Sequence, residues 1–448
     1  MKHETANAYV NIVNRVYPVQ AGQCRVAKNM TEGLFDEAIV RARAKFAAMA
    51  ATFSLGVFND NFYKQAVLLL AVGAGRPDMQ GYALALFTLP FIVFAAPAGW
   101  LADRFPKRTI VIGAKAVEVA AMLAGAVGIC TGHWWLIFTM LGLMGLQAAC
   151  FSPALNGSIP ELYPATYVTK ANAILRIFIT AAILSGTAAA GFALDRTGTG
   201  WFGLARGPLT VALVVIAVAV AGLLVSFGVP KLPAAAPAVK FPWTGPADSI
   251  RQLAAIRKDP PLAIAIGADV FIWFVGSLQI LLINPLGLLQ FELSSSVTSF
   301  LIVAELGGIA AGGLLGSRLA KGPRWHRPVI LSGIIFSLLM MALAAVPCLP
   351  ASARHSTIFA LIAAIGVAGG VFLIPVESFI QVRAAPERKG AILAATNFVV
   401  FIGIMLSGFL ANLFNAAWRP TTSFGLAGLL SLMMVGWLYV GFKREESK

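Results

Sequence analysis

Long apolar runs recur along the whole chain, and short polar segments separate them. Each run has about 20 residues or more, the length at which a helix crosses the hydrocarbon core of a membrane. We expect spans near 46–74, 79–102, 109–131, 134–158, 169–194 and 208–229, and then near 261–289, 295–320, 328–350, 356–380, 389–415 and 421–442. The pattern predicts an all-α integral membrane protein with twelve transmembrane helices in two six-helix bundles.

The segment 230–260 divides the chain between the two sets of runs. It is rich in proline from Pro230 to Pro246, and prolines at this density cannot lie in one continuous helix. We therefore predict an N-terminal bundle over 46–229, a cytoplasmic linker over 230–260 and a C-terminal bundle over 261–442.

The two ends of the chain, 1–45 and 443–448, are predicted to be cytosolic tails. Within the first tail, residues 31–45 have two interpretations. They form a short helix along the membrane surface, with Arg41, Arg43 and Lys45 facing lipid headgroups, or they belong to a plain tail.

Charge is sparse and unevenly placed. Apolar residues make up 58% of the chain, charged residues 12%, and the mean hydropathy is +0.81, whereas a soluble domain carries about a quarter charged residues. The net charge of +15 would suit nucleic acid, but the 34 basic residues fall mostly in short tracts between the apolar runs, which argues against a phosphate-binding face. With the N-terminus placed in the cytoplasm, 26 of them lie on that side and five on the other, so both termini are predicted to be cytoplasmic.

The four cysteines and four histidines are scattered singly, at no spacing typical of a metal or redox site. The longest segments outside the runs, 1–45 and 230–260, are too short for a soluble catalytic domain, and the chain has no nucleotide-binding glycine loop. We therefore expect no metal, no cofactor and no enzymatic activity.

Several ionisable residues fall inside predicted spans, where each costs about 2.5–3.5 kcal/mol unless it has a partner or a wet cavity. Asp60 and Lys64 lie one turn apart in the first span, beside Asn61, and Lys115 and Glu118 lie at i,i+3 in the third. Such pairs either pin helices together or line a substrate site. Because further amides surround the first pair, we take all five as candidate substrate-binding residues.

Arg176, in the fifth span, has no acidic neighbour in its own span. It faces a cavity, a carboxylate from another span or an anionic substrate, and we add it to the candidate substrate-binding residues. Three other intramembrane carboxylates have simpler interpretations. Glu305 lies among glycines that allow close helix packing, and Asp269 and Glu377 fall toward the ends of their spans.

A basic loop, GWLADRFPKR, follows the second span from Gly99 to Arg108. The Asp103 carboxylate can accept hydrogen bonds from the exposed amides of a helix N-terminus, and residues 386–390 open the eleventh span with such a terminus. We expect a latch between the two halves, although the basic residues could simply anchor the loop in the cytoplasm. The candidate gating-loop residues are Gly99, Asp103, Arg104, Lys107 and Arg108.

This loop resembles the signature loop of the major facilitator superfamily, G-x-L-A-D-[RK]-x-G-[RK]-[RK], with Pro106 in place of the second glycine. The chain also resembles the bacterial lysophospholipid transporter family, above all the transporter module that precedes the acyltransferase in fused acyl-acyl-carrier-protein synthetase proteins. The motifs that carry this second resemblance are Phe58 to Asn61 with Lys64 and Gln65, Phe151 to Ala154, Pro160 to Leu162, Ala171 with Asn172, and 386–390 with Asn397.

The resemblance implies a major facilitator fold in the bacterial inner membrane. It implies a flippase that brings lysophospholipids to the cytoplasmic leaflet without using a nucleotide, with Asp60 and Asn61 in the headgroup cavity and with lysophospholipid and membrane lipids as partners. A separately encoded acyltransferase is a further implied partner. The rival interpretation is a proton-coupled exporter of drugs or other amphiphiles on the same fold, with Asp60, Glu118 or Glu305 as proton carrier.

Two departures from the family bear on the substrate. Leu155 and Asn156 stand where the family has a lysine and an aromatic residue, and Arg176 stands where it has a glutamate. Our hypothesis from the sequence is that Arg176 favours an anionic headgroup.

Overall fold

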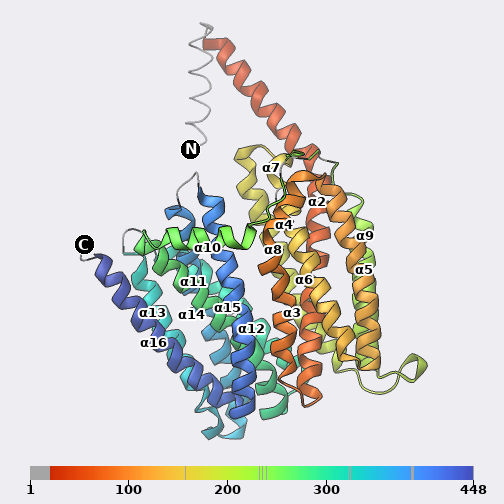
Figure 1. Cartoon of the computed structure of the whole chain (residues 1–448), viewed down its shortest axis with the longest axis vertical. Helices are drawn as coiled ribbons and strands as arrows, with labels where there is room; N and C mark the ends of the chain where they lie inside the picture. The colour runs from red at the N-terminus through yellow and green to blue at the C-terminus, as the bar shows by residue number, and fades with distance from the viewer. Residues whose placement is uncertain are drawn as a thin grey trace.

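The computed structural model describes residues 21–446, except 157, 232, 235, 239, 321, 323 and 385–387. These residues form helices almost throughout, with one isolated β-bridge between Thr199 and Ala205 (Figure 1). The first half comprises α2 (Ala21–Gly73), α3 (Met79–Val93), α4 (Ala95–Arg104), α5 (Lys107–Thr131), α6 (Trp134–Asn156), α7 (Ile159–Leu162), α8 (Ala165–Leu194), η1 (Trp201–Gly203) and α9 (Arg206–Ser226). After α10 (Gly245–Ile256), the second half comprises α11 (Pro260–Pro285), η2 (Leu286–Gln290), α12 (Ser295–Leu319), α13 (His326–Leu343), η3 (Val346–Cys348), α14 (Ala351–Arg383), α15 (Lys389–Ala417) and α16 (Pro420–Glu446).

The predicted spans lie on helices, but α2, which contains the first of them, is not among the helices that are long and apolar enough to cross a membrane. Ten helices in the described part of the chain are long and apolar enough to cross a membrane, and α3 and α4 together make an eleventh that is bent by 54°. The first predicted span lies in α2, whose polar residues around Asp60 do not interrupt the helix. The prediction of an all-α membrane fold is confirmed.

Helix α2 begins earlier than the first predicted span. It runs unbroken from Ala21, where the sequence predicted a tail up to residue 45 with a separate surface helix over 31–45 as one alternative. No proline occurs between Pro18 and Pro77, so nothing in the backbone forces a break. Residues 1–20, and residues 447 and 448 of the other predicted tail, lie outside the described residues.

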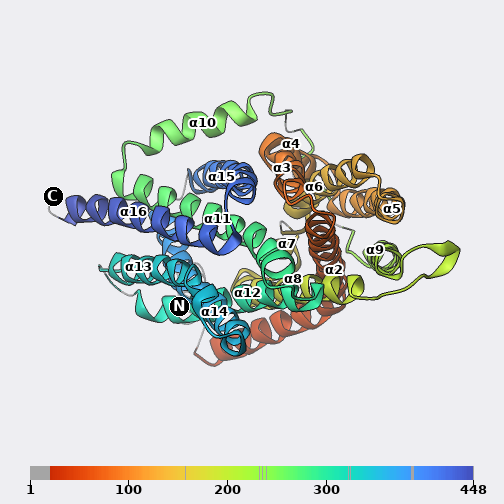
Figure 2. The same ribbon diagram turned by 90° about the horizontal axis from the view of Figure 1, so that it is seen from below.

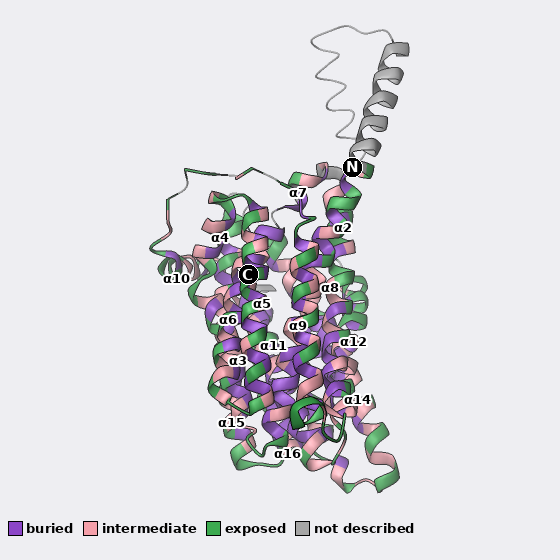
Figure 3. Ribbon diagram, turned by 90° about the vertical axis from the view of Figure 1, so that its right-hand side faces the viewer, coloured by how far each residue is buried: buried purple, intermediate pink, exposed green. Residues whose placement is uncertain are grey.

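The two halves stand side by side, and α10 runs across one end of the molecule (Figure 1). We call this the linker end, and the opposite end, where α2 turns into α3 and α12 begins, the distal end. Buried positions lie on the helix faces turned toward one another, and exposed positions lie on the outer faces (Figure 3). Many exposed side chains are large and apolar, among them Leu123, Leu224 and Leu314, as expected of a surface in contact with lipid.

Glycines bring α12 and α14 into backbone contact. A Cβ added to Gly308 or Gly312 would collide with the backbone of α14, and one added to Gly366 would collide with the carbonyl oxygen of Glu305. The glycine packing predicted around Glu305 is therefore present. Gly307, on the same helix, faces open space.

Gly312→Ala is expected to lower stability by about 1–3 kcal/mol, since the new methyl group meets the Val367 carbonyl and forces two packed helices apart. Gly307→Ala is the matched control. It adds the same methyl group to the same helix with nothing within 4 Å, so it should be neutral or stabilising. Thermal unfolding of the two variants in detergent compares them, and equal unfolding temperatures would contradict the packing argument.

The largest direct contacts between the halves are those of α3 with α15 and of α8 with α12 (Figure 2). At the distal end a chain of buried amides joins them. Gln65 Nε2 donates to Asn284 Oδ1 (2.9 Å), and Asn284 Nδ2 donates to Gln80 Oε1 (2.9 Å). Since Gln65 and Gln80 belong to the first half and Asn284 to the second, these hydrogen bonds hold the distal end closed.

Candidate functional site

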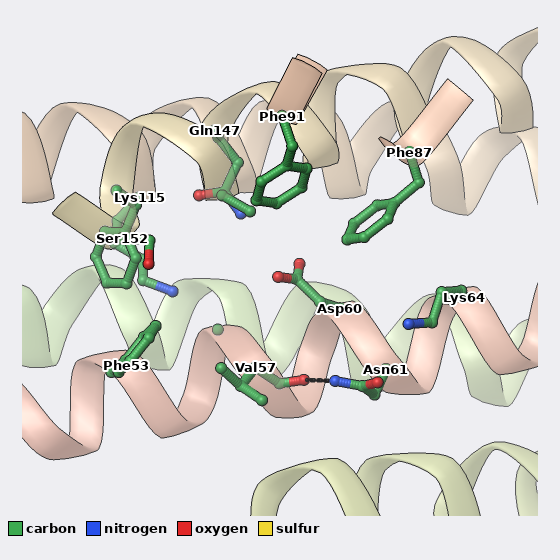
Figure 4. A pocket seen from close by; sticks show the side chains of 13 residues that line it. Phe53, Val57, Asp60, Asn61, Lys64, Phe87, Phe91, Lys115, Gln147 and Ser152 are labelled. Carbon is green, nitrogen blue, oxygen red and sulfur yellow. Dashed lines mark hydrogen bonds between the residues drawn. The ribbon is translucent and has the colours of Figure 1, made fainter. Parts of the chain in front are cut away.

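A cavity lies within the first half, among α2, α3, α5 and α6 (Figure 4). Its polar side chains are Asp60, Asn61, Lys64, Lys115, Gln147 and Ser152. Its aromatic wall consists of Phe53, Phe87, Phe91 and Phe151. The cavity thus joins charges of both signs to an apolar surface.

Asp60 and Lys64 both line this cavity, but they do not neutralise each other. Among the described residues, no ion pair or hydrogen bond joins their side chains. The Lys64 ammonium instead lies 5.2 Å from the centre of the Phe87 ring, and Asp60 Oδ1 is buried without a hydrogen-bond partner. Figure 4 shows the Asp60 carboxylate pointing into the cavity. Both charges are therefore available to a ligand.

The side-chain amide of Asn61 donates a hydrogen bond to the Val57 carbonyl, one turn earlier in α2 (2.8 Å). This hydrogen bond, drawn in Figure 4, keeps the Asn61 carboxamide against its own helix at the edge of the cavity. The sequence did not single out Phe87, Phe91 or Gln147, which complete the lining. The spacing of the two phenylalanines at i,i+4 is a signal that could have placed them on one face.

Lys115 and Glu118 form the local ion pair that their spacing suggested. Lys115 Nζ lies 2.6 Å from Glu118 Oε2, and each side chain is 1% exposed. Asn59 Nδ2 donates to the other Glu118 oxygen (3.1 Å), and Gly56 leaves the room that the ammonium occupies. Lys115 lines the cavity, whereas Glu118 does not. Through its hydrogen bond with Asn59, Glu118 joins α5 to α2.

Two of the candidates do not line this cavity, namely Glu118, which lies behind Lys115, and Arg176, which is exposed on α8. Among the described residues no ion pair joins Arg176 to a carboxylate, so its role stays a prediction.

The gating-loop residues contact their own half and the linker. Lys107 is buried and pairs with Glu161, Arg108 donates to the Phe227 carbonyl (2.7 Å), and Arg104 donates to the Pro237 carbonyl (3.1 Å). Asp103 is exposed, and Gly99 faces open space.

The predicted latch from Asp103 to the start of α15 is not formed in this conformation. No hydrogen bond in the described part of the chain joins Asp103 to residues 388–390, and 386 and 387 lie outside that part. The latch remains a prediction for another conformation.

An interaction of the predicted kind is present at the distal end instead. Both oxygens of Asp195, at the end of α8, accept hydrogen bonds from the first backbone amides of α12, those of Ser295 (2.8 Å) and Ser296 (2.9 Å). Ser294 caps the next orphan amide, that of Val297. Partial burial alone would raise the pKa of the Asp195 carboxyl, but the hydrogen bonds from Ser296 and Ser295 outweigh burial and hold its pKa below the usual value of 3.8.

No group of three or more His, Cys, Asp and Glu residues within the described ranges is arranged to hold a metal ion. What the cavity offers is a binding surface of two charges, amides and aromatic rings.

Comparison with known proteins places the chain among transporters. The sequence profile of the Major Facilitator Superfamily matches residues 45–406. The chain is 28% identical over 364 residues to the lysophospholipid transporter LplT of Salmonella newport (strain SL254), an alignment that covers 79% of this chain and 83% of the relative. The corresponding protein of Salmonella typhimurium gives the same values.

Solved structures share the fold. A bacterial homolog of the human lysosomal transporter Spinster, in an inward-facing conformation, has a TM-score of 0.64 at 15% identity, covering 87% of this chain and 94% of that one. A structure of a proton-dependent oligopeptide transporter has a TM-score of 0.68 at 12% identity, covering 89% and 98%. At these identities the likeness concerns the fold alone.

Proposed function

Because this chain belongs to the Major Facilitator Superfamily and is a secondary transporter of a bacterial membrane, we propose that its substrate is a lysophospholipid. It carries the lipid to the cytoplasmic leaflet of the inner membrane by alternating access, without a nucleotide. The transported lysophospholipid is then available to a separately encoded acyltransferase. The similarity to lysophospholipid transporters supports this substrate class.

The amphipathic lining of the cavity is the observation that carries the proposal. A lysophospholipid has a charged headgroup and one acyl chain, and bare hydrocarbon cannot replace the hydration of the headgroup. The polar side chains of Asp60, Asn61 and Lys64 can replace the hydration of the headgroup. Phe87 and Phe91 provide an apolar surface in the same cavity for the acyl chain.

The distribution of contacts between the halves supports alternating access. The amide chain and the Asp195 hydrogen bonds join the halves at the distal end. The excess of Lys and Arg in the loops of the linker end supports a cytoplasmic position for that end. The described conformation is then closed toward the periplasm, and the opposite state requires these distal hydrogen bonds to break.

Uptake of labelled lysophosphatidylethanolamine and lysophosphatidylglycerol into spheroplasts that lack their own transporter tests the proposal. We expect uptake with the wild type, a loss of at least tenfold with Asp60→Ala, and no change when an uncoupler dissipates the proton gradient. Asp78→Asn is the control, because this carboxylate lies in an exposed distal loop and pairs with Arg76.

Two outcomes would contradict the proposal. If neither lipid enters although the protein is in the membrane, the substrate class is wrong. If transport stops with the uncoupler, the proton-coupled exporter becomes the better interpretation, with the buried carboxylate of Glu305, whose Oε2 has no hydrogen-bond partner, as one candidate proton carrier.

A further inference from the structure

Helix α10, which connects the two halves at the linker end, has two different apolar sides. Gly245 and Ile256 are buried and mark the side that packs against the bundle. Successive residues of a helix are about 100° apart around its axis, so Pro246, Ile250 and Ala254 lie together on another side. All three are exposed, and Ile250 is 58% exposed. We call these three residues the apolar stripe.

The third side of α10 is polar. Asp248 and Arg251 lie there, paired with each other, and their side chains are 51% and 70% exposed. A helix between protein and water needs one apolar side and one polar side. A helix that has protein, an exposed apolar stripe and a polar side in turn is suited to the boundary between protein, hydrocarbon and water.

Contacts with both halves fix the rotation of α10 about its axis. A Cβ added to Gly245 would collide with the Ala96 side chain of α4, in the first half. Gln252 Oε1 accepts a hydrogen bond from Arg388 Nη2 at the start of α15, in the second half (2.6 Å). Since both contacts would break if α10 rolled over, the apolar stripe cannot turn inward.

The position of α10 brings the apolar stripe to the membrane surface. The helix runs across the linker end (Figure 1), and it lies at the rim of the molecule, outside α15, when it is seen from the distal end (Figure 2). Because the long helices cross the membrane, their ends lie where hydrocarbon meets headgroups. The rim of the linker end is therefore in contact with lipid.

An exposed tryptophan extends this surface. Trp243, two residues before α10, is 86% exposed. Its ring lies 4.6 Å from that of Phe241, which lies 5.1 Å from that of Trp100 on α4. The row of rings thus fixes Trp243 on the outside of the molecule, and tryptophan is the residue type enriched at membrane–water boundaries.

Three basic residues flank the apolar stripe, namely Lys240, Arg257 and Lys258, which we call the flanking cations. They are exposed, and among the described residues no ion pair joins them to a carboxylate. The carboxylate next in sequence, Asp259, pairs with Arg383 instead (2.9 Å). Basic segments beside a membrane attract anionic lipids. The charge of this surface therefore complements an anionic leaflet.

We propose that α10 and Trp243 dock on the membrane leaflet at the linker end, with the apolar stripe below the headgroups and the flanking cations bound to anionic lipids. Burial of the stripe and attraction of the cations act together. The inference goes beyond the proposed function, because it holds whatever substrate the protein carries.

Spin labels on the two exposed sides of α10 test the docking in the full-length protein, with its native cysteines replaced, in nanodiscs of phosphatidylcholine and phosphatidylglycerol. Oxygen concentrates in hydrocarbon, whereas a water-soluble nickel complex does not. We expect the ratio of oxygen to nickel accessibility to be severalfold higher for Ala254→Cys, on the apolar stripe, than for Asp248→Cys, on the polar side. Ile250→Asn should lower the ratio at the first site. Equal ratios at the two sites would show that the stripe lies in water, open to a protein partner, and would overturn the proposal.

A fluorophore at Ala254→Cys tests the lipid class, because spin-labelled lipids quench it at close range. Spin-labelled phosphatidylglycerol should quench more strongly than spin-labelled phosphatidylcholine. Replacing the flanking cations by glutamine should reduce this preference at least about fivefold, the contribution of one basic residue beside an anionic surface. Lys170→Gln is the matched control, since it removes an exposed cation from the start of α8, away from α10 (Figure 2). Equal quenching by both lipids in the wild type would overturn the assignment to anionic headgroups.

Discussion

Glu118→Leu is expected to lower the free energy of unfolding by about 3–5 kcal/mol, because it removes the carboxylate that pairs with the buried Lys115 ammonium. The two side chains are each 1% exposed and meet at 2.6 Å. Reversible unfolding in mixed detergent micelles measures the difference between the variant and the wild type.

The size of this effect follows from how tightly Lys115 is enclosed. A Cβ at Gly56 would lie 2.5 Å from the Lys115 ammonium, and Gly222 of α9 flanks the same side chain. Phe151 covers it at 5.1 Å. The ammonium therefore has little room to move once Glu118 is removed.

Replacing both partners should reverse most of the loss. Lys115→Met with Glu118→Leu removes both buried charges and keeps similar volume, a change that is often neutral or stabilising. The exposed pair Asp248–Arg251 is a control, since it has the same i,i+3 spacing but side chains 51% and 70% exposed. Arg251→Ala should cost less than about 1 kcal/mol. A Glu118→Leu loss no larger than that of Arg251→Ala would contradict the argument.

The predictions that succeeded rest on local pattern. A membrane admits helices with about 20 apolar residues, so the runs of the sequence were sufficient to predict the all-α membrane fold. The ion pair of Lys115 and Glu118 also follows from spacing alone. Even so, spacing did not decide the partner of Asp60. Asp60 and Lys64, at the equally favourable i,i+4 spacing, form no ion pair, and the Lys64 ammonium lies 5.2 Å from the centre of the Phe87 ring.

Contacts between distant parts of the chain were not predicted. The sequence contains no signal that Gln65 of the first half and Asn284 of the second are joined by a hydrogen bond. The latch at Asp103 stays a prediction, because residues 386 and 387 lie outside the described residues. The structure contains the same chemistry at Asp195, which belongs to no recognised motif. Spacing determines which residues share a helix face, but the placement of one bundle against the other depends on the whole fold.

Asp195→Ala is expected to shift the equilibrium between conformations about 10- to 100-fold toward one that is open at the distal end. Two amide hydrogen bonds to a carboxylate, at 2.8 and 2.9 Å, join the halves there. The contribution of bonds to a charged group is about 1.5–3 kcal/mol, and each 1.4 kcal/mol changes an equilibrium tenfold. The helix dipole of α12 adds to the attraction.

Distances between spin labels at Thr131 and Glu292, one at the distal end of each half, report this equilibrium in a variant whose native cysteines are replaced. The wild type should give mainly the shorter distance, and Asp195→Ala should add a longer one. Asp195→Asn, which keeps an acceptor but loses the charge, should lie between them. Asp78→Asn, at the same end of the molecule, should match the wild type, because Asp78 pairs with Arg76 in its own loop.

The pH dependence follows from the direction of the Asp195 pKa. Because the hydrogen bonds to Ser295 and Ser296 hold this pKa below its usual value of 3.8, the carboxylate stays charged in the closed conformation. Its contribution is complete above about pH 4 and is lost only as the pH falls through the lowered pKa. The wild-type distances should therefore be constant between about pH 8 and pH 5. A change within that window would show that a titratable group other than Asp195 controls the equilibrium. An Asp195→Ala variant with wild-type distances would show that other contacts hold the distal end closed, with the amides of Gln65, Gln80 and Asn284 as the next to test.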